Sequence, residues 1–424
     1  MQKQRSVAFH TLGCKLNFSE TSTLSRLLEK EGFEKRDFED AADIYVINTC
    51  SVTDNADKEC RHLVRRIQRK SPESLVVITG CYAQLKPEEI ASIPGVDLVL
   101  GAAEKFNIVQ HIAELSKGDS AKICSCEIED VTGFNASYSA NDRTRTFLKV
   151  QDGCDYTCSF CTIPKARGKS RSDSIENVVN NVTELARTTV KEIVLTGVNL
   201  GDFGKGPDGN KKNSEDFLTL LKELDDVEGI ERYRISSIEP NLLTNEIIEF
   251  VANSKKIMPH FHIPLQSGSN TILGMMRRRY KRELYAERVA LIKKFMPHCS
   301  IGVDVIVGFP GETDELFKET FDFLHSLDIS YLHVFTYSER PGTDALNLKP
   351  IVPVHTRNER NKTLRNLSFM KLQYFTQQHS GNERKVLFEI FNKDGMMEGY
   401  TDNYIRIATP YRKEWANEIV DWVV

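Results

Sequence analysis

The sequence of 424 residues has no long apolar run, and no stretch approaches the roughly 20 apolar residues that a membrane-spanning helix needs. Its first six residues are polar and basic and lack the apolar stretch of a secretory signal. No block of Gly, Pro or Ser marks a long disordered linker. We therefore expect a cytoplasmic protein without membrane contact, folded throughout and long enough for two or three domains.

Neither sign of charge dominates, since 56 Lys and Arg are balanced by 60 Asp and Glu, a net charge of −4. This total neither indicates nor excludes a nucleic-acid partner, because local patches of charge decide such binding. Cysteine is not scarce, however, and there are ten. In a chain without a secretory signal thiols stay reduced, and clustered cysteines are more often metal-binding or catalytic than paired in disulfides.

The first 130 residues have the pattern of a parallel α/β domain. Short runs rich in Val, Ile and Leu predict buried strands, and a helix-like stretch follows each of them. The predicted strands span 6–12, 43–48 and 74–79, and the predicted helices span 17–31, 54–70 and 87–91. Segment 131–144 is polar and rich in small residues, which predicts an interdomain linker.

Residues 145–378 continue the alternation of strand and helix and predict a partial barrel, with functional residues at the strand ends. The predicted strands span 146–150, 192–195, 233–235, 261–263, 303–307 and 331–336. The predicted helices span 174–187, 214–224, 241–252, 271–295, 313–327 and 356–378. In 379–424 apolar residues alternate in period two, at 386–391, 403–408 and 419–424, which predicts a small all-β domain. The expected fold class is thus α/β with a C-terminal β domain.

Three cysteines at the end of the first predicted barrel strand, Cys154, Cys158 and Cys161, form Cys-x3-Cys-x2-Cys. Three such thiolates can each bind one iron of a 4Fe-4S cube and leave the fourth iron without a protein ligand. That iron can bind the amino and carboxylate groups of S-adenosylmethionine and reduce its sulfonium, which gives a 5'-deoxyadenosyl radical. A zinc knuckle is the alternative, but it normally has four ligands, and no further His or Cys lies nearby in the sequence.

A second set, Cys14, Cys50 and Cys81, is dispersed in the sequence, yet each member directly follows a predicted buried strand. Because the carboxyl ends of parallel strands lie at one edge of a sheet, the three thiols can converge there. We expect them to hold a second cluster. The alternative is three ordinary core cysteines, since cysteine is among the most often buried residues.

The motifs around these cysteines resemble the methylthiotransferase family of radical S-adenosylmethionine enzymes over essentially the whole chain. The resemblance rests on four segments, 13–17 (GCKLN), 48–53 (NTCSVT), 79–81 (TGC) and 151–164 (QDGC through CSFCTIP). It implies an N-terminal domain with an auxiliary 4Fe-4S cluster, a partial (β/α)6 barrel with a catalytic 4Fe-4S cluster, and a small β domain called TRAM.

For the chemistry, the resemblance implies two uses of S-adenosylmethionine. One molecule methylates sulfur attached to the auxiliary cluster on Cys14, Cys50 and Cys81. A second is cleaved at the cluster on Cys154, Cys158 and Cys161, and the radical removes hydrogen from an unactivated carbon to which the methylated sulfur then joins. An electron donor such as flavodoxin or ferredoxin is an expected partner.

The barrel strand ends offer candidates for holding S-adenosylmethionine. Glycines there permit close backbone approach, and small polar side chains offer hydrogen bonds. Core packing and solvated loops are the alternatives for individual residues. The candidates are Phe160, Thr196, Gly197, Asn199, Ser237, Glu239, Gln266 and Gly308.

Several basic and aromatic residues are candidates for RNA contact. The run Arg277, Arg278, Arg279 and Tyr280 combines guanidinium groups with an aromatic ring, which suits backbone contact and base stacking. In the C-terminal domain, Tyr400 and Tyr404 lie near a turn where bases could stack, with sheet packing as the alternative. A further helix presents Arg61, Arg65 and Arg69 on one face, which a solvated surface would also explain.

The segments 13–15 and 48–53 look most like the branch of the family that modifies threonylcarbamoyladenosine at position 37, in the tRNA anticodon stem-loop. The other branches act on isopentenyladenosine in tRNA or on an aspartate of a ribosomal protein. A non-catalytic iron–sulfur carrier or RNA-binding protein is the alternative of another class. It accounts for the clusters but not for a ligand set with an open iron beside six strand ends rich in Gly, Ser and Asn.

Overall fold

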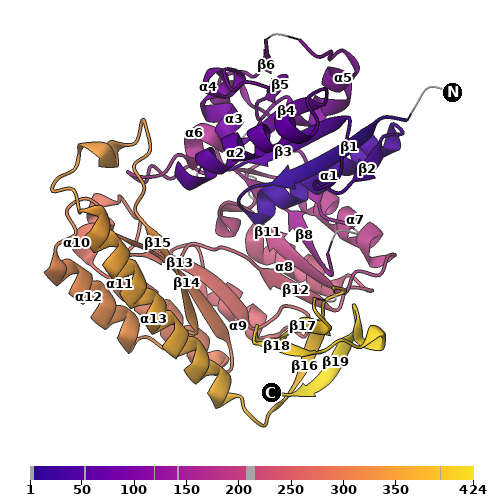
Figure 1. Ribbon diagram of the computed structural model, residues 1–424. Helices are drawn as coiled ribbons and strands as arrows, with labels where there is room; N and C mark the ends of the chain where they lie inside the picture. Colours follow the sequence, from indigo (N-terminus) through magenta and orange to yellow (C-terminus); the bar gives the residue numbers. More distant parts are fainter. Residues whose placement is uncertain (1–3, 52–53, 119, 141–142, 207–214, 392) are drawn as a thin grey trace.

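The computed structural model describes residues 4–51, 54–118, 120–140, 143–206, 215–391 and 393–424, and its N-terminal part is built on a six-stranded parallel sheet (Figure 1). In the order β2-β1-β3-β4-β5-β6 the strands are Glu34–Arg36, Ser6–Thr11, Ile44–Thr49, Leu75–Gly80, Leu98–Leu100 and Lys122–Cys124. The helices are α1 (Lys15–Lys30), α2 (Asp54–Lys70), α3 (Cys81–Leu85), α4 (Pro87–Ala91) and α5 (Ile108–Ala113). The three longer strands are confirmed. The three-residue strands β2, β5 and β6 were not predicted, because so short a run carries too little periodicity.

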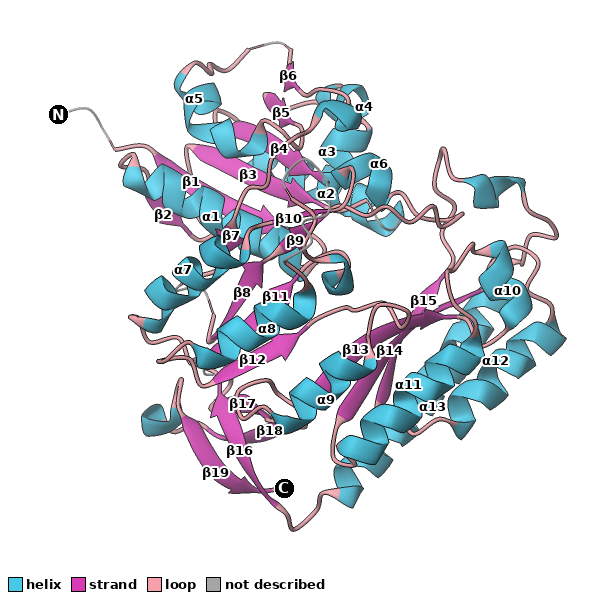
Figure 2. Cartoon of the chain, turned by 180° about the vertical axis from the view of Figure 1, so that it is seen from behind, coloured by secondary structure: helices cyan, strands magenta, loops and turns pink. Residues whose placement is uncertain are grey.

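Six parallel strands form the partial barrel. They are β8 (Arg145–Lys149), β11 (Glu192–Thr196), β12 (Arg232–Ile235), β13 (His260–Gln266), β14 (Ser300–Val307) and β15 (Tyr331–Thr336). A parallel bridge between Ser237 and His262 joins the half that ends at β12 to the half that begins at β13. The helices, which lie outside the strands in Figure 2, are α7 (Ile175–Ala186), α8 (Phe217–Asp226), α9 (Asn245–Asn253), α10 (Asn270–Met275), α11 (Arg282–Phe295), α12 (Asp314–Ser326) and α13 (Val354–Gln378).

One expectation about this region was wrong. The single helix predicted over 271–295 is two helices, α10 and α11, because the chain turns at Arg277 with a left-handed φ of 57°. Within the predicted linker 131–144, β7 (Ser137–Tyr138) pairs antiparallel with β8. The carbonyl of Tyr138 also accepts a hydrogen bond of 2.8 Å from Arg26 in α1. The segment therefore connects the barrel sheet to the N-terminal part.

The C-terminal residues form an antiparallel sheet in the order β18-β17-β16-β19, seen below the barrel in Figure 1. Its strands are β16 (Glu383–Phe388), β17 (Met396–Thr401), β18 (Arg406–Pro410) and β19 (Ile419–Val423). Arg232 and Arg234 of the barrel donate hydrogen bonds to its backbone carbonyls, at 2.7–3.3 Å. The strand β17 was missed, and the strand predicted from 403 begins at 406, because Tyr404 turns the chain with φ 70°. No helix in the described ranges combines the length and apolarity needed to cross a membrane.

A buried ionic network joins the N-terminal sheet to the barrel. Glu20 of α1 is fully buried and contacts Lys105 at 2.7 Å, Lys149 at 3.2 Å and Arg167 at 3.2 Å. Asp152 adds a second carboxylate, 2.9 Å from Arg167 and 3.3 Å from Lys149. Burial alone would raise the pKa of Glu20, but Arg167, Lys105 and Lys149 together hold it well below its usual range.

Glu20→Gln should therefore destabilise the protein strongly. It removes one of two carboxylates and leaves buried cations without compensation, which costs about 3 kcal/mol or more. Urea denaturation of the protein without metal, followed by circular dichroism, measures this loss. The control is Glu31→Gln, because Glu31 is exposed just after the same helix. Equal denaturation midpoints for both variants would contradict the structural role of the network.

Candidate functional site

The three cysteines of the barrel lie in the loop between β9 (Gln151–Asp152) and α6 (Ile163–Arg167). Each sulfur accepts one hydrogen bond. Cys154 accepts from the N–H of Tyr156 at 3.4 Å, Cys161 from the N–H of Ile163 at 3.4 Å, and Cys158 from the guanidinium of Arg278 at 3.2 Å. Donors directed at sulfur stabilise a thiolate and adjust the properties of any metal that it binds.

Two of these thiols, those of Cys154 and Cys161, are nonetheless costly to ionise in the free protein. Burial raises the pKa of Cys154 to about 12 and that of Cys161 to about 11. A bound metal cation reverses this preference, because a coordinated thiol is deprotonated. The loop therefore has the donor set and the hydrogen bonds for a cationic cluster.

Arg278 lies inside the barrel wall and not on the surface. Its side chain is 4% exposed and forms an ion pair with Glu239, which is 13% exposed. Tyr280 is buried beside it and donates its hydroxyl to the carbonyls of Pro264 and Leu265. We therefore correct the expectation of RNA contact for Arg278 and Tyr280, since their polar atoms are bound within the protein. Arg279 is exposed over the ring of Tyr156, at 4.0 Å.

The second set of cysteines lies at the carboxyl edge of the N-terminal sheet. Cys14, Cys50 and Cys81 follow β1, β3 and β4, which are neighbouring strands. Gly13 has φ +99°, and a Cβ there would lie 2.7 Å from the Cβ of Cys50. Gly80 has φ +97°, and a Cβ there would lie 2.3 Å from the carbonyl oxygen of Thr49. Only glycine allows these loops to approach so closely.

Asn17 connects the two cysteine loops. Its amide donates to the carbonyls of Leu12 at 2.8 Å and Thr49 at 2.9 Å, just before Cys14 and Cys50. Its side-chain oxygen accepts a hydrogen bond of 2.6 Å from Arg167, in the helix that follows Cys161. In the sequence, Asn17 was noted only as the last residue of the motif at 13–17. Its role could not be deduced there, because its partners are distant in sequence.

Beside Cys161 lies a cavity of about 240 Å³ between the ends of β13, β14 and β15. Phe160 and Gln266, both expected near S-adenosylmethionine, line it together with Asp304, Ile306 and Phe335. Its walls combine apolar side chains with a few polar groups, which is the usual composition of a small-molecule site.

The candidates on the neighbouring strand ends, Thr196, Gly197 and Asn199, make different contacts within the protein. The hydroxyl of Thr196 donates to the carbonyl of Leu148 at 3.0 Å, and a Cβ on Gly197 would lie 2.8 Å from Gln151. The backbone of Asn199 is bound by Gln151 at 2.8 Å, while its amide nitrogen is buried without a partner among the described residues. Asn199 is thus the one of these three whose side chain has a free donor.

Three further candidates, Ser237, Glu239 and Gly308, are in contact with other residues of the barrel. The carbonyl of Ser237 accepts a hydrogen bond from Leu200 at 3.2 Å. The carboxylate of Glu239 is held by Arg278, so it is not free for a ribose. At Gly308 a Cβ would lie 2.3 Å from Arg357, so the close approach that this glycine permits is to a side chain and not to a ligand.

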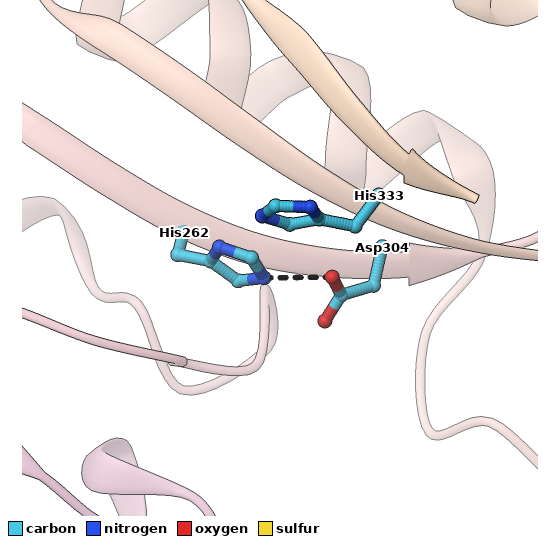
Figure 3. A group of neighbouring side chains, drawn as sticks. All are labelled: His262, Asp304 and His333. Carbon is cyan, nitrogen blue, oxygen red and sulfur yellow. Dashed lines mark ion pairs between the residues drawn. The ribbon is translucent and has the colours of Figure 1, made fainter. Parts of the chain in front are cut away.

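Three polar side chains that sequence reasoning missed lie together on β13, β14 and β15 (Figure 3). His262 contacts Asp304 at 2.8 Å, and its ring stacks on His333 with 5.2 Å between centroids. Among the described residues, this is the only group of three potential ligands whose atoms all lie within 4.8 Å. It could bind a metal ion or hydrogen-bond a polar substrate. Neither cysteine set meets this spacing.

A second cavity, of about 280 Å³, lies between α1, the inner faces of β8, β11, β12 and β13, and the C-terminal sheet. Four cationic residues line it, and no Asp or Glu does; they are Lys15, Arg143, Arg145 and Arg234. Tyr404 closes one side and stacks on His260 at 4.1 Å and on Tyr400 at 4.8 Å. Tyr404 thus stacks between the barrel and the C-terminal sheet, and contact of the two tyrosines with RNA stays a prediction.

Known proteins resemble both parts of this arrangement. The model of the uncharacterized protein family UPF0004 matches residues 6–101, and that of the radical SAM superfamily matches 148–324. The threonylcarbamoyladenosine tRNA methylthiotransferase MtaB of Bacillus subtilis (strain 168) is 41% identical over 98% of this chain and 92% of its own length. The protein of the same name from Aquifex aeolicus (strain VF5) is 42% identical over 96% of this chain and 97% of its own.

The chain belongs to the radical SAM methylthiotransferase family. This confirms the family and the type of enzyme expected from the cysteine motifs, and with it the use of S-adenosylmethionine and a 4Fe-4S cluster. Among solved structures, the radical S-adenosylmethionine methyltransferase TsrM of Kitasatospora setae has a TM-score of 0.59 at 17% identity, over 81% of this chain and 77% of that one. That likeness confirms the α/β fold class.

Arg278→Met should destabilise the barrel of this methylthiotransferase by about 3 kcal/mol, because it leaves Glu239 buried without a cation and Cys158 without its donor. Adding Glu239→Gln should restore much of the loss, since the two residues form one pair. The measurement is urea denaturation of the protein without metal, with Arg279→Met as the exposed control. Strictly additive losses in the double variant would contradict the pairing.

Proposed function

We propose that this enzyme transfers a methylthio group to the C-2 carbon of threonylcarbamoyladenosine at position 37 of tRNA. The observation that supports it most is the placement of two three-cysteine sets at adjoining strand edges, connected by the Asn17–Arg167 hydrogen bond. The names of the relatives at 41–42% identity favour this substrate over isopentenyladenosine and over a ribosomal aspartate.

In this proposal, Cys154, Cys158 and Cys161 hold the radical-generating 4Fe-4S cluster. The donor on each sulfur and the adjacent cavity are compatible with such a cube. The cluster supplies the electron that cleaves S-adenosylmethionine to the 5'-deoxyadenosyl radical. Phe160 and Gln266, which line that cavity, enclose the nucleoside part of S-adenosylmethionine.

Cys14, Cys50 and Cys81 hold the auxiliary 4Fe-4S cluster. Three cysteines leave one iron for the sulfur that is transferred, and the exposed position of Cys14 opens the set toward the barrel. Gly13 and Gly80 allow the loops to close around the cluster, and Asn17 holds them at the barrel edge.

The target carbon explains the need for a radical. The C-2 carbon of adenine has a strong C–H bond and no acidic proton, so a general base cannot open it. Phe160, Ile306 and Phe335 line the adjacent cavity with apolar surface. A flavodoxin or ferredoxin supplies the electrons, and exposed arginines such as Arg277 and Arg279 contact the anticodon stem-loop.

Loss of each proposed cluster should block a different step of the reaction. Anaerobically reconstituted wild-type enzyme should hold about eight irons, and Cys158→Ala and Cys81→Ala about four each. Cys81→Ala should still release 5'-deoxyadenosine from S-adenosylmethionine under dithionite but form no methylthio product, whereas Cys158→Ala should do neither. A wild-type protein that stays at about four irons would refute the two-cluster proposal, and the reverse behaviour of the variants would exchange the roles.

The substrate is tested by mass spectrometry of nucleosides from tRNA of cells with and without the gene. Deletion of the gene should remove the methylthio form of threonylcarbamoyladenosine and leave threonylcarbamoyladenosine itself. The two are distinguished by mass, because the added sulfur and methyl change the mass of that nucleoside alone. Loss of methylthio isopentenyladenosine instead would reassign the substrate. Unchanged tRNA together with an unmodified ribosomal aspartate would exclude an RNA substrate.

A further inference from the structure

The 280 Å³ cavity beside Cys14 has an unbalanced set of charges. Arg234 is saturated, since it donates to Glu192 at 2.8 Å and to the carbonyls of Asp402 and Thr401 at 2.9 and 2.7 Å. Arg145 is paired with Glu389 at 3.0 Å. These two arginines are therefore bound to the protein, and their charges are offset by the carboxylates of Glu192 and Glu389.

The other two cations lack an anion. Arg143 stacks over Phe18 at 4.3 Å and over Phe147 at 5.7 Å, and no described carboxylate pairs with it. Lys15 has no hydrogen-bond or ion-pair partner among the described residues, and it borders the same cavity. Both side chains are exposed to solvent. Cationic groups gathered without acidic neighbours provide a site for an anion.

The start of helix α1 adds to this potential. Lys15 is its first residue, and the 16-residue helix has no acidic residue in its first turn and no side-chain cap at Cys14. The free N–H groups at such an end favour negative charge. The lysine and the helix end thus point to the same kind of ligand.

The position of the cavity further restricts the kind of anion that it can bind. It extends from Cys14, a proposed ligand of the auxiliary cluster, to Val194, Ile235 and His260 on the barrel strands. A base that receives sulfur from that cluster has to lie within reach of both. The threonylcarbamoyl group ends in a carboxylate, which an isopentenyl group does not have.

We propose that this cavity binds the carboxylate of the threonylcarbamoyl group, with Lys15 and Arg143 as the two groups that pair with it. The inference rests on the proposed function. In this arrangement Phe18 and Phe147 pack against the aliphatic part of the threonine. The unpaired cations also disfavour a base with an apolar N6 substituent, because binding it would bury them without an anion.

Binding to anticodon stem-loop RNA tests the proposal with reconstituted enzyme. Three RNAs are compared, carrying threonylcarbamoyladenosine, its carboxylate methyl ester or plain adenosine at position 37. The wild-type enzyme should bind the first about tenfold more tightly than the other two, since a charge-assisted pair contributes at least that much. Lys15→Gln and Arg143→Gln should each abolish most of this preference, and Lys15→Arg should retain it. Lys30→Gln, at the far end of the same helix, is the matched control and should keep it fully.

The remaining outcomes are decisive. If both glutamine variants weaken binding of all three RNAs equally, the cavity binds a backbone phosphate and the proposal is wrong. If neither variant changes any binding constant, the cavity is not a substrate site. Arg143→Gln keeps the test valid should Lys15→Gln lose iron, because Arg143 is remote from Cys14 in sequence. A wild-type enzyme that does not modify threonylcarbamoyladenosine refutes the proposed function; normal modification with an unaltered preference in the variants refutes this inference alone.

Discussion

The structure depends on one buried ionic contact, between Arg167 and the carboxylates of Glu20 and Asp152. Arg167 directly follows the cysteine loop of the barrel, while Glu20 lies on the helix that starts after Cys14. Lys105 and Lys149 complete the network from both sides. Because a buried charge without its partner is strongly unfavourable, the two domains are held in one relative position. The two cysteine loops are positioned with them.

The balance of buried charges also matters at the two candidate sites, the barrel cysteine loop and the basic cavity. Burial makes ionisation of the Cys154 and Cys161 thiols unfavourable, so a cationic cluster and the donors from Tyr156 and Ile163 have to favour the thiolates. Arg278 donates to the third sulfur, that of Cys158. Arg278 in turn is neutralised by Glu239. In the basic cavity the compensation is incomplete, because Lys15 and Arg143 lack an anion. Cations without a protein anion distinguish a binding site for a charged substrate from a structural ion pair.

Much of this could be predicted from the sequence, because the relevant signals are local. Buried strands followed by Cys14, Cys50 and Cys81 indicated the carboxyl edge of a sheet, and the spacing of Cys154, Cys158 and Cys161 indicated an open-iron ligand set. What failed depended on distant partners. The basic run around Arg278 resembles a surface for RNA until Glu239, 39 residues away, is seen to pair with it. His262, Asp304 and His333 each follow the ordinary pattern of a strand and gather only when the strands align.

The central claim is that a radical formed beside Cys154, Cys158 and Cys161 removes the hydrogen at the C-2 carbon of the modified adenosine. A tRNA with deuterium at that carbon tests it most directly. After turnover, mass spectrometry should find one deuterium in 5'-deoxyadenosine for each methylthio group formed. Deuterium released to water, or retained in the product nucleoside, would contradict the account.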